Sequence, residues 1–195
     1  MFFIRLHDAF FDLIERATAG WLPGLFARLA FASVLLIYFW HSATRKLVAS
    51  ERGAEGALAE YFTVSGNTFA QIAPKAFETA GYDATQLDTP FWVMAYAGTY
   101  GEFILPLLVV IGFATRLASL GMIVFVFVQS WVDITGHQAG AETIGTPFDR
   151  IQDSAILDQR LLWLVPLVYL VVRGAGALSV DGVLSRRMGL RGSMG

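Results

Sequence analysis

Hydrophobic residues along this chain gather in four long runs, with polar segments between them. The runs cover about residues 21–40, 91–113, 116–132 and 156–172. A helix rises about 1.5 Å per residue, so each run is roughly 25–35 Å long and matches the hydrocarbon layer of a bilayer. The pattern therefore predicts an all-α protein, built as a transmembrane four-helix bundle.

The first 20 residues show a different pattern, in which polar and apolar positions recur at helical spacing. One side carries Arg5, Asp8, Asp12, Glu15 and Arg16, and the other carries Phe3, Phe10, Leu13, Ile14 and Ala17. The pattern predicts an amphipathic interfacial helix at the membrane surface. The alternative is a helix that packs on a loop. Because charges are scattered through this segment, it does not resemble a cleavable signal.

The links between the runs differ in length. Ala114 and Thr115 are almost all that joins the second and third runs, which predicts a tight antiparallel hairpin. The links at 41–90 and 133–155 are long and polar, and a short helix is expected near 56–61. Long loops on one side of a bundle often cover a site. The alternative is that both are flexible linkers.

These elements predict an interfacial helix (1–20), a four-helix membrane domain (21–185) and a basic tail (186–195). Basic residues near the runs favour cytoplasmic termini and external long loops, although the two sides differ little. Composition agrees with a membrane protein, since 55% of residues are apolar and 15% are charged. The chain has no cysteine, which excludes thiol redox chemistry of its own, and its net charge of −2 argues against a nucleic-acid partner.

Glu102 is an ionisable residue inside the second run, and Pro106 follows it by four positions. Proline has no N–H group, so the backbone carbonyl of Glu102 loses its usual helical partner. Lipid cannot satisfy either group, so this position should face protein or trapped water. Glu102 is therefore the candidate catalytic residue. The alternative is a structural ion pair, for which Arg28 in the first run is a candidate counter-charge, unless its side chain extends to the membrane interface instead.

Further polar candidates lie near the ends of the first and third runs. His41 and Arg45 share a helix face, and with Lys46 they form a positive cluster that could bind an anion, a quinone oxygen or an acidic loop. The alternative is an interfacial anchor. Gln129, Asp133 and His137 follow one another at one-turn intervals, which is compatible with a proton relay or half of a metal site. No metal-site spacing is present, so we expect no metal.

Several segments resemble the DoxX family. Gly101-Glu102, Pro106-Leu107-Leu108 and the stretch 112–118 are similar to its second-helix glutamate, its PLLLxLG stretch and its TRLAA turn. The stretch 173–181 is similar to the closing RGPGxLSLD motif, and the stretch 40–47 is similar to WxSGxxKL. The acidic–aromatic pair at 60–61 matches one in the first loop of many members. Ala43 and Ala175 replace a glycine and a proline of the family pattern.

The resemblance, which covers residues 22–185, implies a multi-pass protein of the bacterial inner membrane with both termini cytoplasmic. Some DoxX-like proteins are membrane subunits of thiosulfate:quinone oxidoreductases, and others associate with superoxide dismutase and a sulfurtransferase. The branch nearest to this sequence accompanies multinuclear iron oxidases that modify small metal-binding peptides. These relatives imply a redox-accessory subunit, in contact with lipid and with a protein partner or further copies of itself.

The sequence carries no cofactor or autonomous catalytic motif, so electron transfer would require a quinone or a cofactor that a partner holds. Whether the chain is itself part of an enzyme stays open. One alternative is a membrane scaffold without chemistry of its own. The other is a small-solute transporter, which a single short bundle without an inverted repeat fits poorly.

Overall fold

The computed structural model describes residues 1–49 and 58–189, and this part of the chain contains helices and no strand. Four helical segments are long and apolar enough to cross a membrane: Leu22–Thr44, Thr89–Ile111, Thr115–Thr135 and Ala155–Arg173. The prediction of an all-α transmembrane bundle is confirmed. The observed helices extend up to four residues beyond the expected runs at some ends, because polar side chains such as Thr44 and Asp133 still occupy helical turns.

Two of the spans are interrupted by wider turns. The first span consists of α2 (Leu22–Phe31), a π-helical turn (Ala32–Leu36) and α3 (Ile37–Thr44). The second and third spans are the continuous helices α7 (Thr89–Ile111) and α8 (Thr115–Thr135). The fourth consists of a π-helical turn (Ala155–Arg160) and α10 (Leu161–Arg173).

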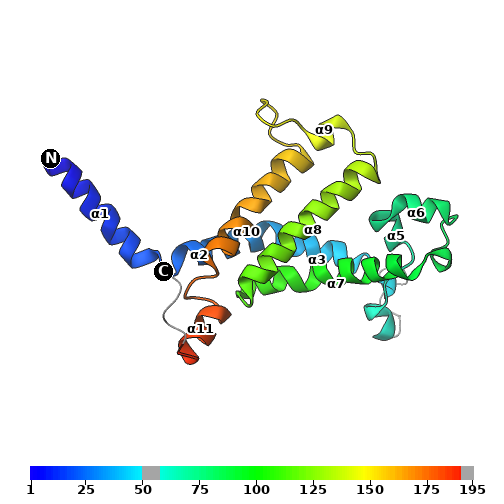
Figure 1. The fold of residues 1–195 in the computed structure, drawn as a ribbon, viewed down its shortest axis with the longest axis horizontal. Coiled ribbons are helices and arrows are strands. Elements are labelled where there is room, and N and C mark those ends of the chain that lie inside the picture. The colour runs from blue at the N-terminus through cyan, green and yellow to red at the C-terminus, as the bar shows by residue number, and fades with distance from the viewer. Residues whose placement is uncertain (50–57, 190–195) are drawn as a thin grey trace.

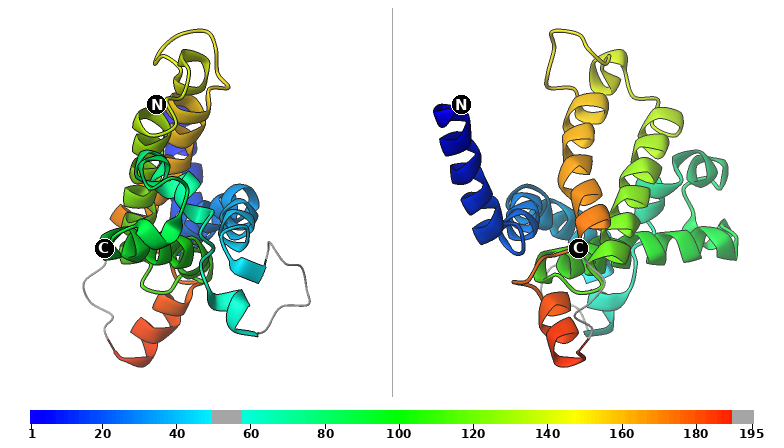
Figure 2. Two further views of the ribbon diagram at one scale, coloured as in Figure 1. Left: turned by 90° about the vertical axis from the view of Figure 1, so that its right-hand side faces the viewer. Right: turned by 60° about the vertical axis from the view of Figure 1, so that its left-hand side comes forward.

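The four spans form two pairs that meet at one end and diverge at the other (Figure 1). α3 runs beside α7, and α8 runs beside α10, while α10 contacts α2 and α8 contacts α7. We call the end where α2 and α8 begin the terminal end, and the opposite end the loop end. Figure 2 shows the same divergence from two further directions. Polar groups at the loop end can therefore lie between the pairs.

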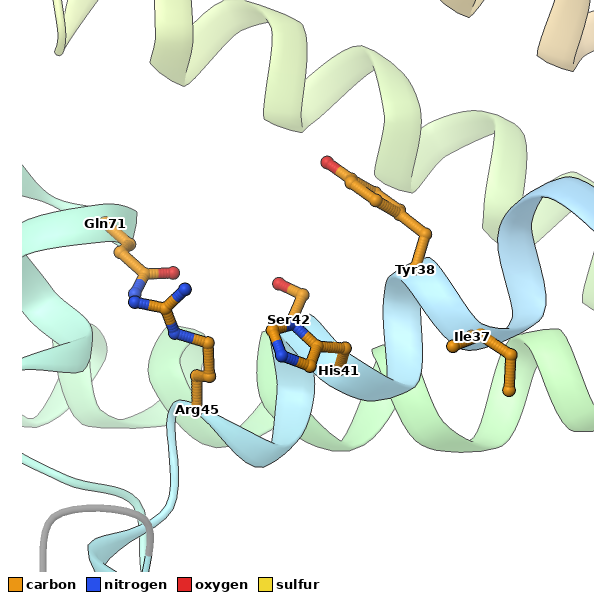
Figure 3. Close-up of a pocket in the computed structure, with 6 residues that line it drawn as sticks. All are labelled: Ile37, Tyr38, His41, Ser42, Arg45 and Gln71. Atoms are coloured by element: carbon orange, nitrogen blue, oxygen red, sulfur yellow. The ribbon is translucent and has the colours of Figure 1, made fainter.

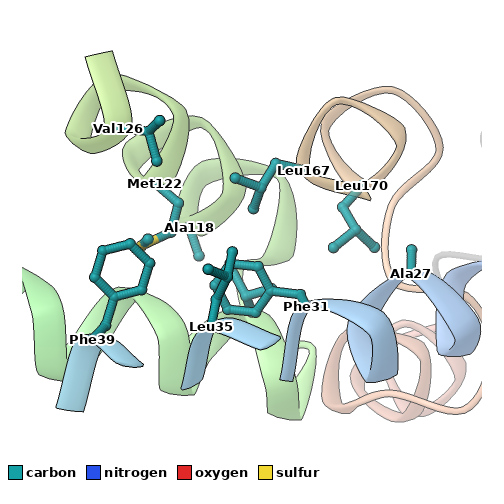
Figure 4. Close-up of a cluster of buried hydrophobic side chains, with 10 residues drawn as sticks. Ala27, Phe31, Leu35, Phe39, Ala118, Met122, Val126, Leu167 and Leu170 are labelled. Atoms are coloured by element: carbon teal, nitrogen blue, oxygen red, sulfur yellow. The ribbon is translucent and has the colours of Figure 1, made fainter. Parts of the chain in front are cut away.

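The apolar core lies where the two pairs meet (Figure 4). The first span contributes Phe31, Leu35 and Phe39, which recur every four residues and so share one helix face. α8 and α10 close the core with Met122 and Leu167, both fully buried. Large apolar side chains on the outer faces remain exposed, as expected for helices that face lipid.

α1 (Phe2–Thr18) is a helix, as its pattern predicts, and it extends away from the bundle (Figure 1). Its apolar residues Phe3, Phe10 and Leu13 are all exposed. The helix therefore has an apolar side that the described chain leaves uncovered.

The first long loop is built of short helices around a small core of its own. They are a 3-10 turn (Leu58–Phe62), α5 (Thr68–Ile72), α6 (Pro74–Thr79) and a second 3-10 turn (Ala84–Gln86). Phe69 and Phe77 pack with Ala95 of α7, so the described part of this loop is anchored to the second span. Residues 56 and 57, where the expected short helix begins, lie outside the described residues.

The second long loop contains α9 (Ala141–Ile144), and the chain after α10 ends in α11 (Val180–Arg187). The expected hairpin between α7 and α8 is present, with Gly112 and Ala114 both at positive φ (72° and 46°). Asp181 of α11 accepts hydrogen bonds from the backbone N–H groups of Ala114 and Thr115, at 2.8 and 2.9 Å. Of the predicted basic tail, residues 190–195 lie outside the described residues.

Candidate functional site

Glu102 lies in α7 and is paired with Lys46. The Lys46 Nζ atom is 2.6 Å from Glu102 Oε1, and the two side chains are 7% and 4% exposed. Ser42 joins the pair, since its hydroxyl donates to Glu102 Oε1 at 3.2 Å and accepts from Lys46 Nζ at 3.3 Å. A lysine, a serine and a glutamate from two spans thus form one buried polar cluster.

The first loop fixes the position of Lys46. α3 ends at Thr44, and the backbone carbonyl of Lys46 then accepts hydrogen bonds from the Ser65 N–H at 2.8 Å and the Thr68 hydroxyl at 2.9 Å. Ser42 lies in the last turn of α3, and Lys46, two residues beyond the end of the helix, reaches back to it with its side chain. The first loop thus folds back on the end of the first span and holds the lysine against α7.

Two polar atoms beside the ion pair are buried and have no hydrogen-bond partner among the described residues. They are Oε2 of Glu102 and the hydroxyl of Thr99, which lie three residues apart on one face of α7. A buried polar atom without a partner costs about 1–3 kcal/mol. The arrangement therefore leaves an acceptor and a hydroxyl available for a further polar group, such as water or a ligand hydroxyl.

A cavity of about 540 Å³ borders this cluster at the loop end (Figure 3). Its walls are formed by Ile37, Tyr38, His41, Ser42, Arg45 and Gln71. Ser42 belongs both to the cavity wall and to the ion-pair cluster. In Figure 3 the Arg45 side chain reaches toward Gln71 of α5, and Tyr38 extends toward α8. The cavity thus has His41 and Arg45 in its wall and reaches the buried Glu102 through the Ser42 hydroxyl.

Three further polar contacts lie at the loop end, one between the two helix pairs and two within the α8–α10 pair. The Gln129 amide donates to the Tyr38 hydroxyl at 3.0 Å, which joins α8 to α3. Arg160 forms an ion pair with Asp133 and donates to the Ser130 hydroxyl at 3.0 Å.

His137 lies 3.1 Å from the Gln71 carbonyl, through its Nε2 atom. Asp133 and His137 therefore have separate partners among the described residues. No group of three or more histidine or acidic residues that could hold a metal occurs within residues 1–49 and 58–189.

Arg28 lies at the opposite end of the bundle, so its expected pairing with Glu102 is wrong. Its guanidinium is buried and donates to the Val110 carbonyl at 2.8 Å and to the Leu178 carbonyl. Val110 is in the last turn of α7, where carbonyls lack a helical partner. Arg28 thus caps the end of the second span, and Lys46 provides the counter-charge of Glu102.

The structure adds residues that the sequence reasoning did not single out, namely Tyr38, Ser42, Thr99, Ser130 and Arg160. For Ser42 the sequence contains a usable signal: its spacing of four residues from Lys46 could have indicated that the two side chains meet. Pro106 lies inside α7 as expected, and the Trp40 indole donates to the neighbouring Phe103 carbonyl at 3.1 Å. This bond joins the last helix of the first span to the middle of α7 beside the site.

The fold and the site together define a class of protein: a four-span membrane protein whose second span carries a buried acid paired with a lysine at the end of the first. The model of the DoxX family matches residues 24–133, a stretch that includes Lys46 and Glu102. Since this match covers more than half of the sequence, the chain belongs to the DoxX family. Neither the curated proteins nor the solved structures include a match to this chain.

Proposed function

We propose that this protein is an accessory membrane subunit of a redox or oxidative-stress system, and that its loop-end cavity binds a quinone-like ligand. The observation that carries the proposal is the route from the cavity through Ser42 to the buried Glu102–Lys46 pair. Ligand cavities of about 300–1,000 Å³ are usual for small organic molecules, and this one has about 540 Å³.

The residues at the cavity suit a ring that carries oxygen atoms. Tyr38 and Ile37 supply apolar surface, and His41 and Arg45 supply donors at the mouth. The Ser42 hydroxyl already donates to Glu102, so at the inner end it can accept from a quinol hydroxyl, while Oε2 of Glu102 has no partner among the described residues. A bound quinone supplies two-electron, two-proton chemistry, and the electrons would be exchanged with the redox centre of a partner protein.

Glu102 and Lys46 would serve as the proton-transfer pair of this site. As an ionised pair they are neutral in sum, so the cluster can accept a proton on Glu102 or release one from Lys46. Ser42 contacts both and lines the cavity, which gives it the role of positioning residue between ligand and pair.

For the placement in the cell we propose the bacterial inner membrane, with both termini cytoplasmic and the loop end outside. α1 would lie in the membrane surface with its apolar side in the lipid, since Phe10 and Leu13 on that side are 57% and 67% exposed. A partner protein, or a second copy of the chain, would contact the bundle and supply the redox centre.

The test measures the binding of a short-chain ubiquinone to the detergent-purified protein. Quenching of tryptophan fluorescence is the readout. The variant is Lys46→Met/Glu102→Gln, which removes both charges together and so leaves no unpaired buried ion. We expect it to fold and to bind the quinone at least about tenfold more weakly, since a hydrogen bond to a charged group is worth about 1.5–3 kcal/mol.

The matched control is Asp133→Asn/Arg160→Met, which removes the other loop-end ion pair. Neither of its residues lines the cavity, so its affinity should stay within about threefold of the wild type. Equal binding by all three proteins, or no binding by the wild type, would refute the quinone site. The better explanation would then be that the protein is a membrane scaffold without chemistry of its own.

A further inference from the structure

A second cavity, of about 790 Å³, lies at the terminal end of the bundle. It is bordered by the start of α2, the α7–α8 hairpin, the end of α10 and α11. Figure 1 shows these elements together, with α11 below the ends of the spans. This cavity is separate from the Glu102 cluster, and none of its lining residues belongs to the site proposed above.

Positive charge predominates in the wall of this cavity, which contains Arg116, Arg173 and Arg186. The Arg186 guanidinium donates to the Ala177 carbonyl at 3.0 Å, which fixes it in the wall. Asp181 also lines the cavity, but its carboxylate already accepts hydrogen bonds from the Ala114–Thr115 turn. Three arginines against one engaged carboxylate leave a net positive site.

The depth of the cavity matches the headgroup layer of a membrane. Arg116 is the second residue of the third span, and Arg173 is the last residue of the fourth. Beside them, Leu117 and Val172 line the cavity and are 73% and 63% exposed. The cavity therefore combines a cationic part at the span ends with apolar surface that continues along the lipid-facing sides of α8 and α10.

We propose that this cavity binds a phosphate ester, as the headgroup of an anionic phospholipid whose acyl chains lie along α8 and α10. Guanidinium groups bind phosphate oxygens in pairs of hydrogen bonds, and basic pockets between membrane helices select anionic headgroups. The open apolar flank at Leu117 and Val172 favours a lipid over free phosphate, which shares the headgroup chemistry.

The connection to α1 agrees with this depth. The Ala177 N–H donates to the Gly20 carbonyl at 2.8 Å, and Ala19 and Gly20 line the cavity directly after α1. A helix that ends at the rim of a headgroup site and exposes an apolar side is well placed to lie in the same layer of lipid.

The test measures phosphatidylglycerol bound to the detergent-purified protein, by native mass spectrometry and by the shift in unfolding temperature. The variant Arg173→Gln/Arg186→Gln should bind this lipid roughly 30-fold more weakly, given the usual contribution of a basic residue near an anionic surface. The control Lys75→Gln/Arg150→Gln removes the same charge from exposed loop residues and should stay within about twofold. Arg173→Gln alone, at an exposed residue, should lose about fivefold and tests the same point if the double variant folds poorly.

Phosphatidylethanolamine and inorganic phosphate are the comparison ligands. Selective binding of phosphatidylglycerol that depends on the arginines supports the lipid site. Binding of inorganic phosphate with the same dependence, without lipid binding, would assign the cavity to free phosphate and overturn the lipid. Equal binding of both lipids, or equal binding by variant and control, would overturn the site itself.

Discussion

At the scale of single residues, the Glu102–Lys46 ion pair differs in burial from the Asp133–Arg160 ion pair. Its side chains are 4% and 7% exposed, whereas Asp133 in the pair with Arg160 is 31% exposed. When one partner of a buried pair is removed, the other charge stays in a low-dielectric site and the fold loses about 3–5 kcal/mol. Water can still solvate an unpaired charge at the more exposed pair.

We therefore expect Glu102→Gln alone to lower the free energy of unfolding by about 3–5 kcal/mol, and the added Lys46→Met to restore most of it. Thermal unfolding in detergent would measure both. Arg160→Met should cost less than half as much, because the charge it leaves unpaired is that of Asp133, which is 31% exposed. If the Glu102→Gln protein is as stable as the wild type, the buried charge of Lys46 does not need Glu102 as its partner.

The burial of Glu102 could be predicted from the sequence, but its partner could not. A glutamate within an apolar run must be enclosed, whatever the arrangement of the helices. Which cation it meets depends on how far the first span slides along the second, and the long link from 45 to 88 does not fix this register. The sequence favours Arg28 and assigns Lys46 to a separate positive cluster, and only the folded loop around Lys46 brings this lysine to Glu102.

At the scale of elements, the α7–α8 hairpin depends on α11. The Asp181 carboxylate accepts from the backbone of Ala114 and Thr115 and from the Thr115 hydroxyl at 2.7 Å. It thereby caps the first turn of α8, where N–H groups lack helical partners. The four apolar spans follow from the hydropathy pattern, but this cap joins segments more than 60 residues apart and leaves no local signal.

We expect Asp181→Ala to lower the free energy of unfolding by about 1–2 kcal/mol, the usual cost of losing a helix cap. The measurement is thermal unfolding, with Glu78→Ala as a control at an exposed acidic residue of α6. Asp181→Asn should lose less than the alanine variant, because one oxygen remains to accept. If both variants unfold like the wild type, α11 does not stabilise the hairpin.

At the scale of the whole molecule, the two cavities lie at opposite ends of the bundle, so the orientation in the membrane decides which side each one faces. The chain lacks cysteine, so a single introduced thiol can be detected without background. Phe148 lies fully exposed in the second loop, and Arg187 is exposed at the end of α11.

With the orientation proposed above, a membrane-impermeant maleimide should label Phe148→Cys in intact spheroplasts. It should label Arg187→Cys only after the membrane is opened, because a charged reagent does not cross the bilayer. The degree of labelling, measured by gel shift, gives the result directly. The opposite pattern would place the loop end in the cytoplasm and reverse the proposed topology.

The bonds that Arg28 and Ala114–Thr115 make to Leu178 and Asp181 also set an order of assembly. During synthesis the first three spans emerge from the ribosome long before residues 178–181 exist. Until then the Nη2 group of Arg28 and the amides at the start of the third span must rely on water or lipid headgroups. Residues 178–181 therefore complete the hydrogen bonds between the spans last, and the bundle reaches its final state only after the fourth span is inserted.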